Sequence, residues 1–469
     1  MHHSIRLLPV ALLVVACGAP VSTVDPTSDR PVELGCPVLP DSAGLRADIL
    51  TVGLTGAVSP AALPSAADPD LALVSRQLFE PLIRVDCLGR ALPGTARHWH
   101  RSRDGRTWAF LLDSAARFSD GTPVTAEDVL RSWAVSYGRR NRREPADSPW
   151  SWFHPDSVAV LPTGELQVSL VRPAGEDPLL FAHASLAVFK AGDPWPVGTG
   201  PFRVLQAAPD VLVLGGNPHY PGPIREGLEL RFLRRTGADP RDLLAEGVDL
   251  LQVRVRSHVE YASGSDEYHL APLPWSRLLL LNAPAAVITD EVVDADEAIL
   301  RAELAHEVAM TPARPAAEFV FETSPHDCPG ELFPAAPKDP GRRTRTVAFD
   351  PEDPDAAEIA ARIVAVANAP GTTPPFGLSP GTYSARSAPL GNGSAGLRVV
   401  GCRNTFPDPC LVLAALADDL RAGESTRLIP LVATRVYLVH RPGIGGVSAD
   451  WDGTPLLARA GRGRAPVVP

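Results

Sequence analysis

The sequence predicts an α/β protein built from more than one domain. Its 469 residues are too many for a single compact core, and a content of 45% hydrophobic and 21% charged residues is typical of globular proteins. Runs with strand character are followed by runs with helix character, as in residues 346–350 and 356–367. The 50 prolines and 38 glycines favour long loops over long helices. Two or three domains are therefore expected.

The stretch from Phe118 to Trp133, FSDGTPVTAEDVLRSW, predicts a strand end, a tight turn and a capped helix. Gly121 supplies a residue that accepts positive φ in the turn. Thr125 is suited to cap the helix, and Asp128 three residues later completes a capping box, so the helix should begin at about residue 126. The apolar positions that then share one helical face are Ala126, Val129, Leu130, Trp133 and Tyr137.

The N-terminus has the features of an export signal, which we assign to residues 1–17. Arg6 precedes an apolar run from Leu7 to Ala16 that is too short to span a bilayer. Residues 14–17, VVAC, resemble a bacterial lipobox, in which Cys17 is acylated and becomes the mature N-terminus. The alternative is an ordinary cleaved signal in which Cys17 has no role. Residues 18–45 are rich in Pro, Ser and Asp and are expected to form a tether, with order beginning after them.

The cysteines other than Cys17 are expected to meet an oxidising compartment, because the chain is exported. Five of the six remain, an odd number, so at least one thiol is free or paired outside the chain. Cys402 and Cys410 lie close together in the sequence and are candidates for a disulfide, although spacing alone does not determine connectivity. No CxxC pattern occurs, and no metal site is predicted.

Neither nucleic-acid binding nor catalysis is indicated. A net charge of −10 and a pI of about 5.7 argue against the basic surface that nucleic-acid binding requires. His306 starts an HExxH-like string, but Met310 occupies the position of the second histidine. Ser394 lies in a GxSxG-like string whose first glycine is replaced by Asn392. We therefore expect no enzyme activity, no catalytic residues and no cofactor.

The string from residue 118 to residue 133 resembles the signature "FsDGtPlTAeDVvfSw" of family 5 extracytoplasmic solute-binding proteins, the peptide- and nickel-binding class of ABC importers. Residues 198–204, GTGPFRV, and 406–409, FPDP, resemble two further motifs of that family, in the same order. The resemblance implies a two-lobed periplasmic-binding-protein type II fold. It places lobe I at residues 46–270 and 431–469, with an extra subdomain at about 76–190, and lobe II at residues 271–430.

The function that this resemblance implies is capture of a solute, peptide-like or otherwise small and polar, and its delivery to an ABC permease in the membrane. The protein would act as a monomer, lipid-anchored on the periplasmic or extracellular face of the cell envelope. The alternative is a degenerate relative that no longer serves transport and acts as an envelope sensor or interaction lipoprotein. A shortened second lobe motivates this alternative, as does one departure from the family pattern in the loop before FPDP.

That departure lies at Thr405, which takes the position of an aspartate that pairs with a peptide's α-ammonium in the family, while Cys402 replaces the usual aromatic residue. Arg403, Asn404 and Thr405 instead offer donors that suit a carboxylate, a phosphate or a sugar. Other candidates stand elsewhere: Trp275 and Arg277 at the predicted crossover between lobes, and Asp408 in the loop itself. The alternative reading makes Trp275 a core residue, Arg277 a solvated one and Asp408 a turn-former.

Overall fold

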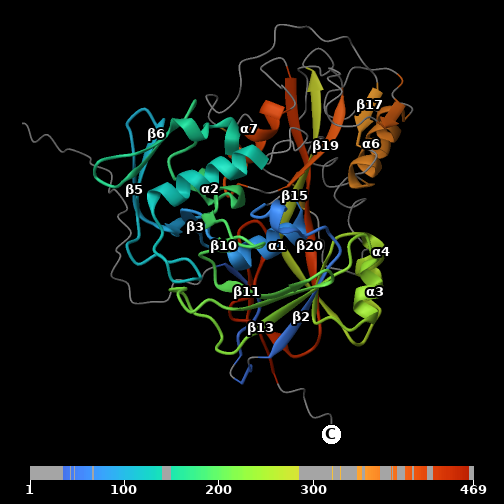
Figure 1. Cartoon of the computed structure of the whole chain (residues 1–469). Coiled ribbons are helices and arrows are strands. Elements are labelled where there is room, and N and C mark those ends of the chain that lie inside the picture. The colour runs from blue at the N-terminus through green and yellow to red at the C-terminus, as the bar shows by residue number, and fades with distance from the viewer. Residues whose placement is uncertain are drawn as a thin grey trace, which may run out of the picture. The chain divides into compact units, whose positions relative to one another are not determined.

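The computed structural model describes residues 35–463, apart from residues 43, 47, 66–67, 140–148, 285–318, 321–327, 329–345, 351–353, 370–381, 383, 388–396, 404–405 and 420–425. Within these residues the chain is a mixed α/β protein, as predicted (Figure 1). The helices are α1 (Pro69–Leu78), α2 (Ala126–Arg139), α3 (Pro240–Ala245), α4 (Arg256–Ser263), α6 (Pro354–Ala367) and α7 (Pro409–Asp419). Single 3-10 turns are η1 (Pro60–Ala62), η2 (Pro149–Ser151), η3 (Pro155–Ser157), η4 (Leu179–Ala182) and η5 (Ala184–Leu186). No described helix has both the length and the apolar character needed to cross a bilayer.

The largest sheet joins β2, near the start of the described chain, to strands between residues 202 and 440. Its order is β11 (Phe202–Ala208), β12 (Val211–Gly216), β13 (Glu229–Arg234), β2 (Ile49–Leu54), β14 (Leu250–Val253), β20 (Thr426–His440), β15 (His269–Pro284), β19 (Arg398–Arg403), β17 (Thr346–Phe349) and β18 (Ser384–Ser387), and β16 (Phe319–Val320) also pairs with β20. The two long strands, β15 and β20, run antiparallel to each other through the predicted lobe boundaries near residues 270 and 430. Helix α6 packs beside β17 and β19 (Figure 1).

A separate four-stranded sheet lies within the range predicted for the extra subdomain. Its order is β5 (Ala96–Arg101), β6 (Thr107–Leu112), β8 (Leu166–Ser169) and β7 (Val158–Val160). Helix α2 packs against β7 of this sheet, and its fully buried Val129 and Trp133 belong to one apolar cluster with Val158 and Leu166. The Trp133 indole also donates to the Leu186 carbonyl at 2.8 Å, so burial of this ring leaves no donor unpaired.

The predicted strand-turn-helix corner is confirmed. Gly121 has φ of 87°, and α2 begins at Ala126. The backbone N–H of Thr125 donates to Asp128 Oδ2 at 2.9 Å, and the backbone N–H of Asp128 donates to Thr125 Oγ1 at 3.3 Å. These reciprocal bonds are a capping box, which satisfies donors that have no partner inside the helix.

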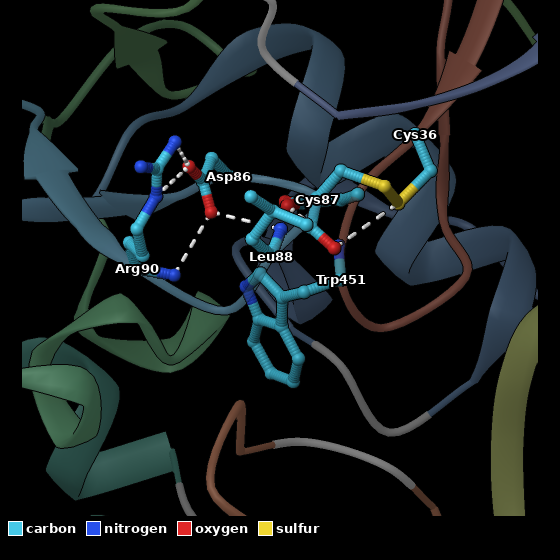
Figure 2. The surroundings of a disulfide bond; sticks show 7 residues. Cys36, Asp86, Cys87, Leu88, Arg90 and Trp451 are labelled. Atoms are coloured by element: carbon cyan, nitrogen blue, oxygen red, sulfur yellow. Dashed lines mark hydrogen bonds and ion pairs between the residues drawn. A yellow bond between two sulfur atoms is a disulfide. The ribbon is translucent and has the colours of Figure 1, made fainter.

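Order begins earlier than predicted. Residues Cys36–Leu39 form β1, which pairs with β22 (Val447–Ala449), and β22 pairs with β23 (Pro455–Leu456). A disulfide also joins Cys36 to Cys87 in the turn between β3 (Ile83–Val85) and β4 (Ala91–Pro93) (Figure 2). The expectation that residues up to about 45 form only a tether is therefore wrong, because its cues, proline and polar residues, carry no information about partners far along the chain.

The remaining described strands form two small pairs, β9 (Phe189–Lys190) with β10 (Val197–Gly198) and β21 (Ile444–Gly445) with β24 (Gly461–Arg462). The first pair holds the signature corner, because Lys190 Nζ lies 2.5 Å from Asp120 Oδ2 and the backbone N–H of Ser119 donates to the Gly198 carbonyl at 2.9 Å. His306 and Ser394, the residues of the two incomplete catalytic motifs, lie outside the described residues.

Candidate functional site

Two predicted site residues occupy facing positions on neighbouring strands. In the antiparallel pair of β15 and β19, Arg277 stands opposite Arg403, and Leu278 stands opposite Cys402. Residues directly opposite each other in such a pair have Cβ atoms about 4.5–5.5 Å apart. The sheet thus brings together residues that are far apart in the sequence and places two arginines at one position of the crossover. Trp275 precedes them on β15, where its register partner is Arg435 of β20.

Arg277 is held by a carboxylate that the sequence did not single out. Its Nη1 atom lies 3.0 Å from Asp355 Oδ2, and Arg254 Nη1 lies 3.0 Å from the same oxygen. The side chains are partly exposed, at 15% for Arg277, 32% for Arg254 and 25% for Asp355. Asp355 lies in the first turn of α6, where a negative charge is favourable. Asp355 therefore pairs with both arginines at the start of α6.

Asp408 begins helix α7 rather than standing free. The backbone N–H of Cys410 donates to its Oδ1 atom at 2.8 Å, and the backbone N–H of Leu411 donates to its carbonyl at 3.0 Å. Burial raises the pKa of Asp408, the bond from Cys410 opposes that rise, and the nearby charge of Asp177 adds to it. Asp408 thus has the turn-forming role, and its contact with a ligand stays a prediction.

The disulfide predicted between Cys402 and Cys410 is wrong. Cys410 is bonded to Cys328, with Cα atoms 5.5 Å apart and a separation of 82 positions in the sequence. Cys402 lies on β19. Its side chain lies outside the described part of the structure, as do the side chains of Trp275 and Arg403. Asn404 and Thr405 lie wholly outside the described residues. Their roles as ligand contacts stay predictions.

One buried residue of the same loop was missed in the sequence. The Phe406 ring is fully buried, 5.4 Å from the Trp152 ring and 5.0 Å from the His183 ring. Trp152 and His183 lie in the part of the molecule that contains α2, here called the α2 side, and both are also fully buried. Arg172 lies over the Trp152 ring at 4.6 Å. We call Trp152, His183 and Phe406 the aromatic junction. No sequence signal pointed to it, because Phe406 is more than 200 positions from both Trp152 and His183.

Metal ligands do not gather in the described part of the chain. No group of three or more His, Cys, Asp or Glu side chains there has the arrangement to hold a metal ion. The described residues do place Arg277 and Arg403 as register partners at the crossover, and arginine is a residue type that binds anionic groups.

Comparison with known sequences identifies the middle of the chain. Residues 91–250 match the family model of bacterial extracellular solute-binding proteins, family 5 Middle. The periplasmic oligopeptide-binding protein OppA of Escherichia coli is 47% identical over 143 residues, which are 26% of this chain and 26% of that protein. The periplasmic murein peptide-binding protein MppA of Escherichia coli is 38% identical over 96 residues, 19% of this chain and 17% of that protein. The sequence matches thus span about a quarter or less of these two relatives.

Comparison with solved structures extends the similarity in fold. The unliganded open form of MppA, a periplasmic murein tripeptide-binding protein, matches with a TM-score of 0.59 at 16% identity, covering 91% of this chain and 98% of that one. At this identity the match concerns the fold alone. It confirms the predicted α/β, two-lobed fold of the second periplasmic-binding-protein type. The relatives are binding proteins by name, and residues 91–250 of this chain are similar to the middle part of family 5 of the bacterial extracellular solute-binding proteins.

Proposed function

We propose that this chain captures a small polar solute outside the cytoplasm and hands it to an ABC permease, as a monomer anchored to the membrane by lipid on Cys17. The observation that carries the proposal is the family 5 match over residues 91–250, which includes the signature corner at 118–133. The apolar run before Cys17 supports export and anchoring.

The solute we propose carries a carboxylate or another anionic group. Arg277 and Arg403 are register partners at the crossover, and Asp355 pairs with both Arg254 and Arg277. Arginine binds carboxylate and phosphate through two parallel N–H donors, which gives both affinity and orientation. The proposed ligand contacts are Trp275, Arg277, Arg403, Asn404, Thr405 and Asp408.

The lobes we propose are residues 46–270 with 431–469, and 271–430, with the extra subdomain at about 76–190. The long antiparallel strands β15 and β20 support this division, because they pass through both boundaries side by side and serve as the crossover. Strand β1 extends the first lobe to residue 36, since its partner β22 belongs to the returning segment.

Native mass spectrometry of protein purified from its own host tests the proposal, because a solute held between two lobes is carried through purification when it binds tightly. The solute found in this way is then titrated into wild type, Arg403→Ala and Arg386→Ala. We expect at least a tenfold loss of affinity for Arg403→Ala. Arg386 is an exposed residue of β18, and its replacement should leave the affinity unchanged. Equal affinity of all three proteins for every solute identified would refute the assignment of Arg403.

A second candidate, an envelope sensor or interaction lipoprotein of the same fold, is favoured by Thr405, which removes the aspartate that the peptide-binding pattern has at that position. A permease gene beside the coding sequence supports transport, whereas a solitary gene supports this candidate.

A further inference from the structure

The aromatic junction has walls that are formed without Phe406. The Trp152 carbonyl accepts a hydrogen bond from the backbone N–H of Val171 at 2.8 Å, which fixes the turn that carries the indole. The backbone N–H of Ser185 donates to His183 Nδ1 at 3.0 Å, which fixes the imidazole ring. Both rings are therefore positioned by their own neighbours on the α2 side of the molecule. A pocket whose walls are held independently of its occupant is pre-organised for an aromatic ring.

The occupant comes from a distant part of the chain. Phe406 follows β19 and precedes α7, whose first turn is fixed by the Asp408 cap and by the disulfide from Cys410 to Cys328. Its loop is the one that carries the proposed ligand contacts Arg403 and Asp408. The ring thus enters the α2 side from the segment that the proposed function assigns to the solute.

The junction also contains a donor that has no partner among the described residues. Trp152 is fully buried, and none of the described residues accepts a hydrogen bond from its Nε1 atom. A buried N–H without an acceptor is costly, and a phenylalanine ring offers no oxygen or nitrogen atom to satisfy it. A guest that brings an aromatic ring together with a carbonyl or hydroxyl oxygen would bind the same walls and supply the missing acceptor.

We propose that the space between Trp152 and His183 is an aromatic-binding subsite that this chain fills with its own Phe406. A solute bearing an aromatic side chain and a nearby oxygen acceptor takes the place of that ring, and Phe406 thereby sets which solutes are admitted. The second claim, that a solute displaces Phe406, rests on the proposed function. It deepens that function because it names an aromatic group as part of the solute.

The test is a calorimetric titration of the purified full chain with N-acetyl-L-phenylalaninamide, which carries a ring and two carbonyl oxygens. In wild type the probe must displace Phe406, whereas in Phe406→Ala the subsite is empty, so we expect at least tenfold tighter binding to the variant. N-acetyl-L-alaninamide, which lacks the ring, should bind to neither protein. Equal affinity of wild type and Phe406→Ala for the phenylalanine probe, or binding of the alanine probe to the variant, would overturn the proposal.

Phe153→Ala is the matched control. Phe153 is 1% exposed and belongs to the same apolar cluster, but its ring packs against Trp133 at 5.4 Å and Phe181 at 6.1 Å, which lie outside the aromatic junction. Its removal leaves an internal void that a whole amino-acid amide does not enter. Probe binding by Phe153→Ala equal to that by Phe406→Ala would make the effect a general consequence of core truncation and would refute the subsite.

Two further arms keep the result interpretable. If Phe406→Ala loses its near-ultraviolet circular dichroism, Phe406→Leu replaces it, and we then expect at least threefold tighter probe binding than in wild type. No difference would again refute the subsite. The titration needs neither permease nor natural solute, so failure of the transport proposal leaves its outcome unchanged. A solute identified by mass spectrometry that competes with the probe supports the second half of the proposal, and one that binds without competing refutes that half.

Discussion

Asp355 and Arg277 form an ion pair that joins helix α6 to strand β15, with 3.0 Å between Asp355 Oδ2 and Arg277 Nη1. Arg254, which follows β14, lies 3.0 Å from the same oxygen. A single carboxylate on α6 therefore connects β15 and the residue after β14, two strands of the largest sheet, to the helix that packs against that sheet. The sharing also places two guanidinium groups close together, and Asp355 screens their mutual repulsion.

We expect Asp355→Asn to lower the free energy of unfolding by about 1 kcal/mol, since the groups are partly exposed and the remaining arginines then repel each other. Urea denaturation at low salt measures this change. Glu246→Gln is the control, because Glu246 pairs with Arg235 at 3.1 Å and both side chains are more exposed, so the cost should stay below about 0.5 kcal/mol. If Asp355→Asn lowers the free energy of unfolding no more than the control does, the shared carboxylate does not contribute to stability.

The disulfide pairing predicts the number of free thiols. A chain that lacks residues 1–17 has five cysteines, and the bonds of Cys36 to Cys87 and of Cys328 to Cys410 leave one thiol, that of Cys402. Titration with Ellman's reagent in guanidinium without reductant should therefore find one thiol per chain. It should find none in Cys402→Ser and two in Cys328→Ser. Mass mapping that recovers a peptide joining residues 402 and 410 would contradict the pairing.

The buried Asp450 gives stability a specific dependence on pH. Burial raises its pKa from 3.8 to about 6, the charge of Arg76 opposes the rise, and Asp452 adds to it. Because the folded state has the higher pKa, it binds more protons than the unfolded state between about pH 4 and pH 6. The ionised carboxyl group therefore costs stability at neutral pH, and that cost disappears as pH falls through 6.

Asp450→Asn removes this titration. Between pH 7 and pH 4.5 the stability of wild type should rise by about 2 kcal/mol relative to the variant, as measured by chemical denaturation at both values. The comparison cancels the groups that both proteins share, including Glu80, whose pKa burial also raises. Replacement of the exposed Asp242 by Asn corrects for the loss of one carboxylate. If the difference in the free energy of unfolding between wild type and Asp450→Asn does not change with pH, the raised pKa assigned to Asp450 is wrong.

The capping box of α2 has a definite energetic value. Thr125→Ala removes the hydroxyl that accepts from the backbone N–H of Asp128 and donates to its Oδ2 atom at 2.8 Å. We expect a loss of about 1 kcal/mol in the free energy of unfolding, the usual cost of a lost cap. Thr125→Ser keeps the hydroxyl and should retain most of the stability. If serine and alanine cost the same in thermal or urea unfolding, the hydroxyl is not the stabilising group.

The sequence predicted best where structure depends on near neighbours. The turn at Gly121, the cap at Thr125 and the start of α2 all follow from interactions within a few residues, and the strand predicted at residues 346–350 and found at Thr346–Phe349 follows from a short run with strand character. Helix α6 begins at Pro354, two residues before the predicted start, which is the usual uncertainty of helix ends.

Contacts between distant residues were not predictable in the same way. Asp355 is 78 residues from Arg277 and 101 from Arg254, and no local pattern links them. Cys410 is bonded to Cys328 and not to Cys402, because the fold, and not sequence spacing, determines which sulfur atoms lie close enough to bond. Helix α7, PCLVLAALADD, is apolar on nearly every side and so lacks the alternation that marks a half-exposed helix.

The bond between Cys36 and Cys87 has a mechanical consequence (Figure 2). Strand β1 has four residues and a few hydrogen bonds to β22. A modest force along the chain would break these hydrogen bonds one after another. Tension that arrives from residues before 36 instead passes at once through a covalent sulfur–sulfur bond into the turn at residue 87, where Asp86 is fastened to Arg90 at 2.6 Å. Force applied to the chain before residue 36 therefore acts on the β3–β4 hairpin and does not extend β1.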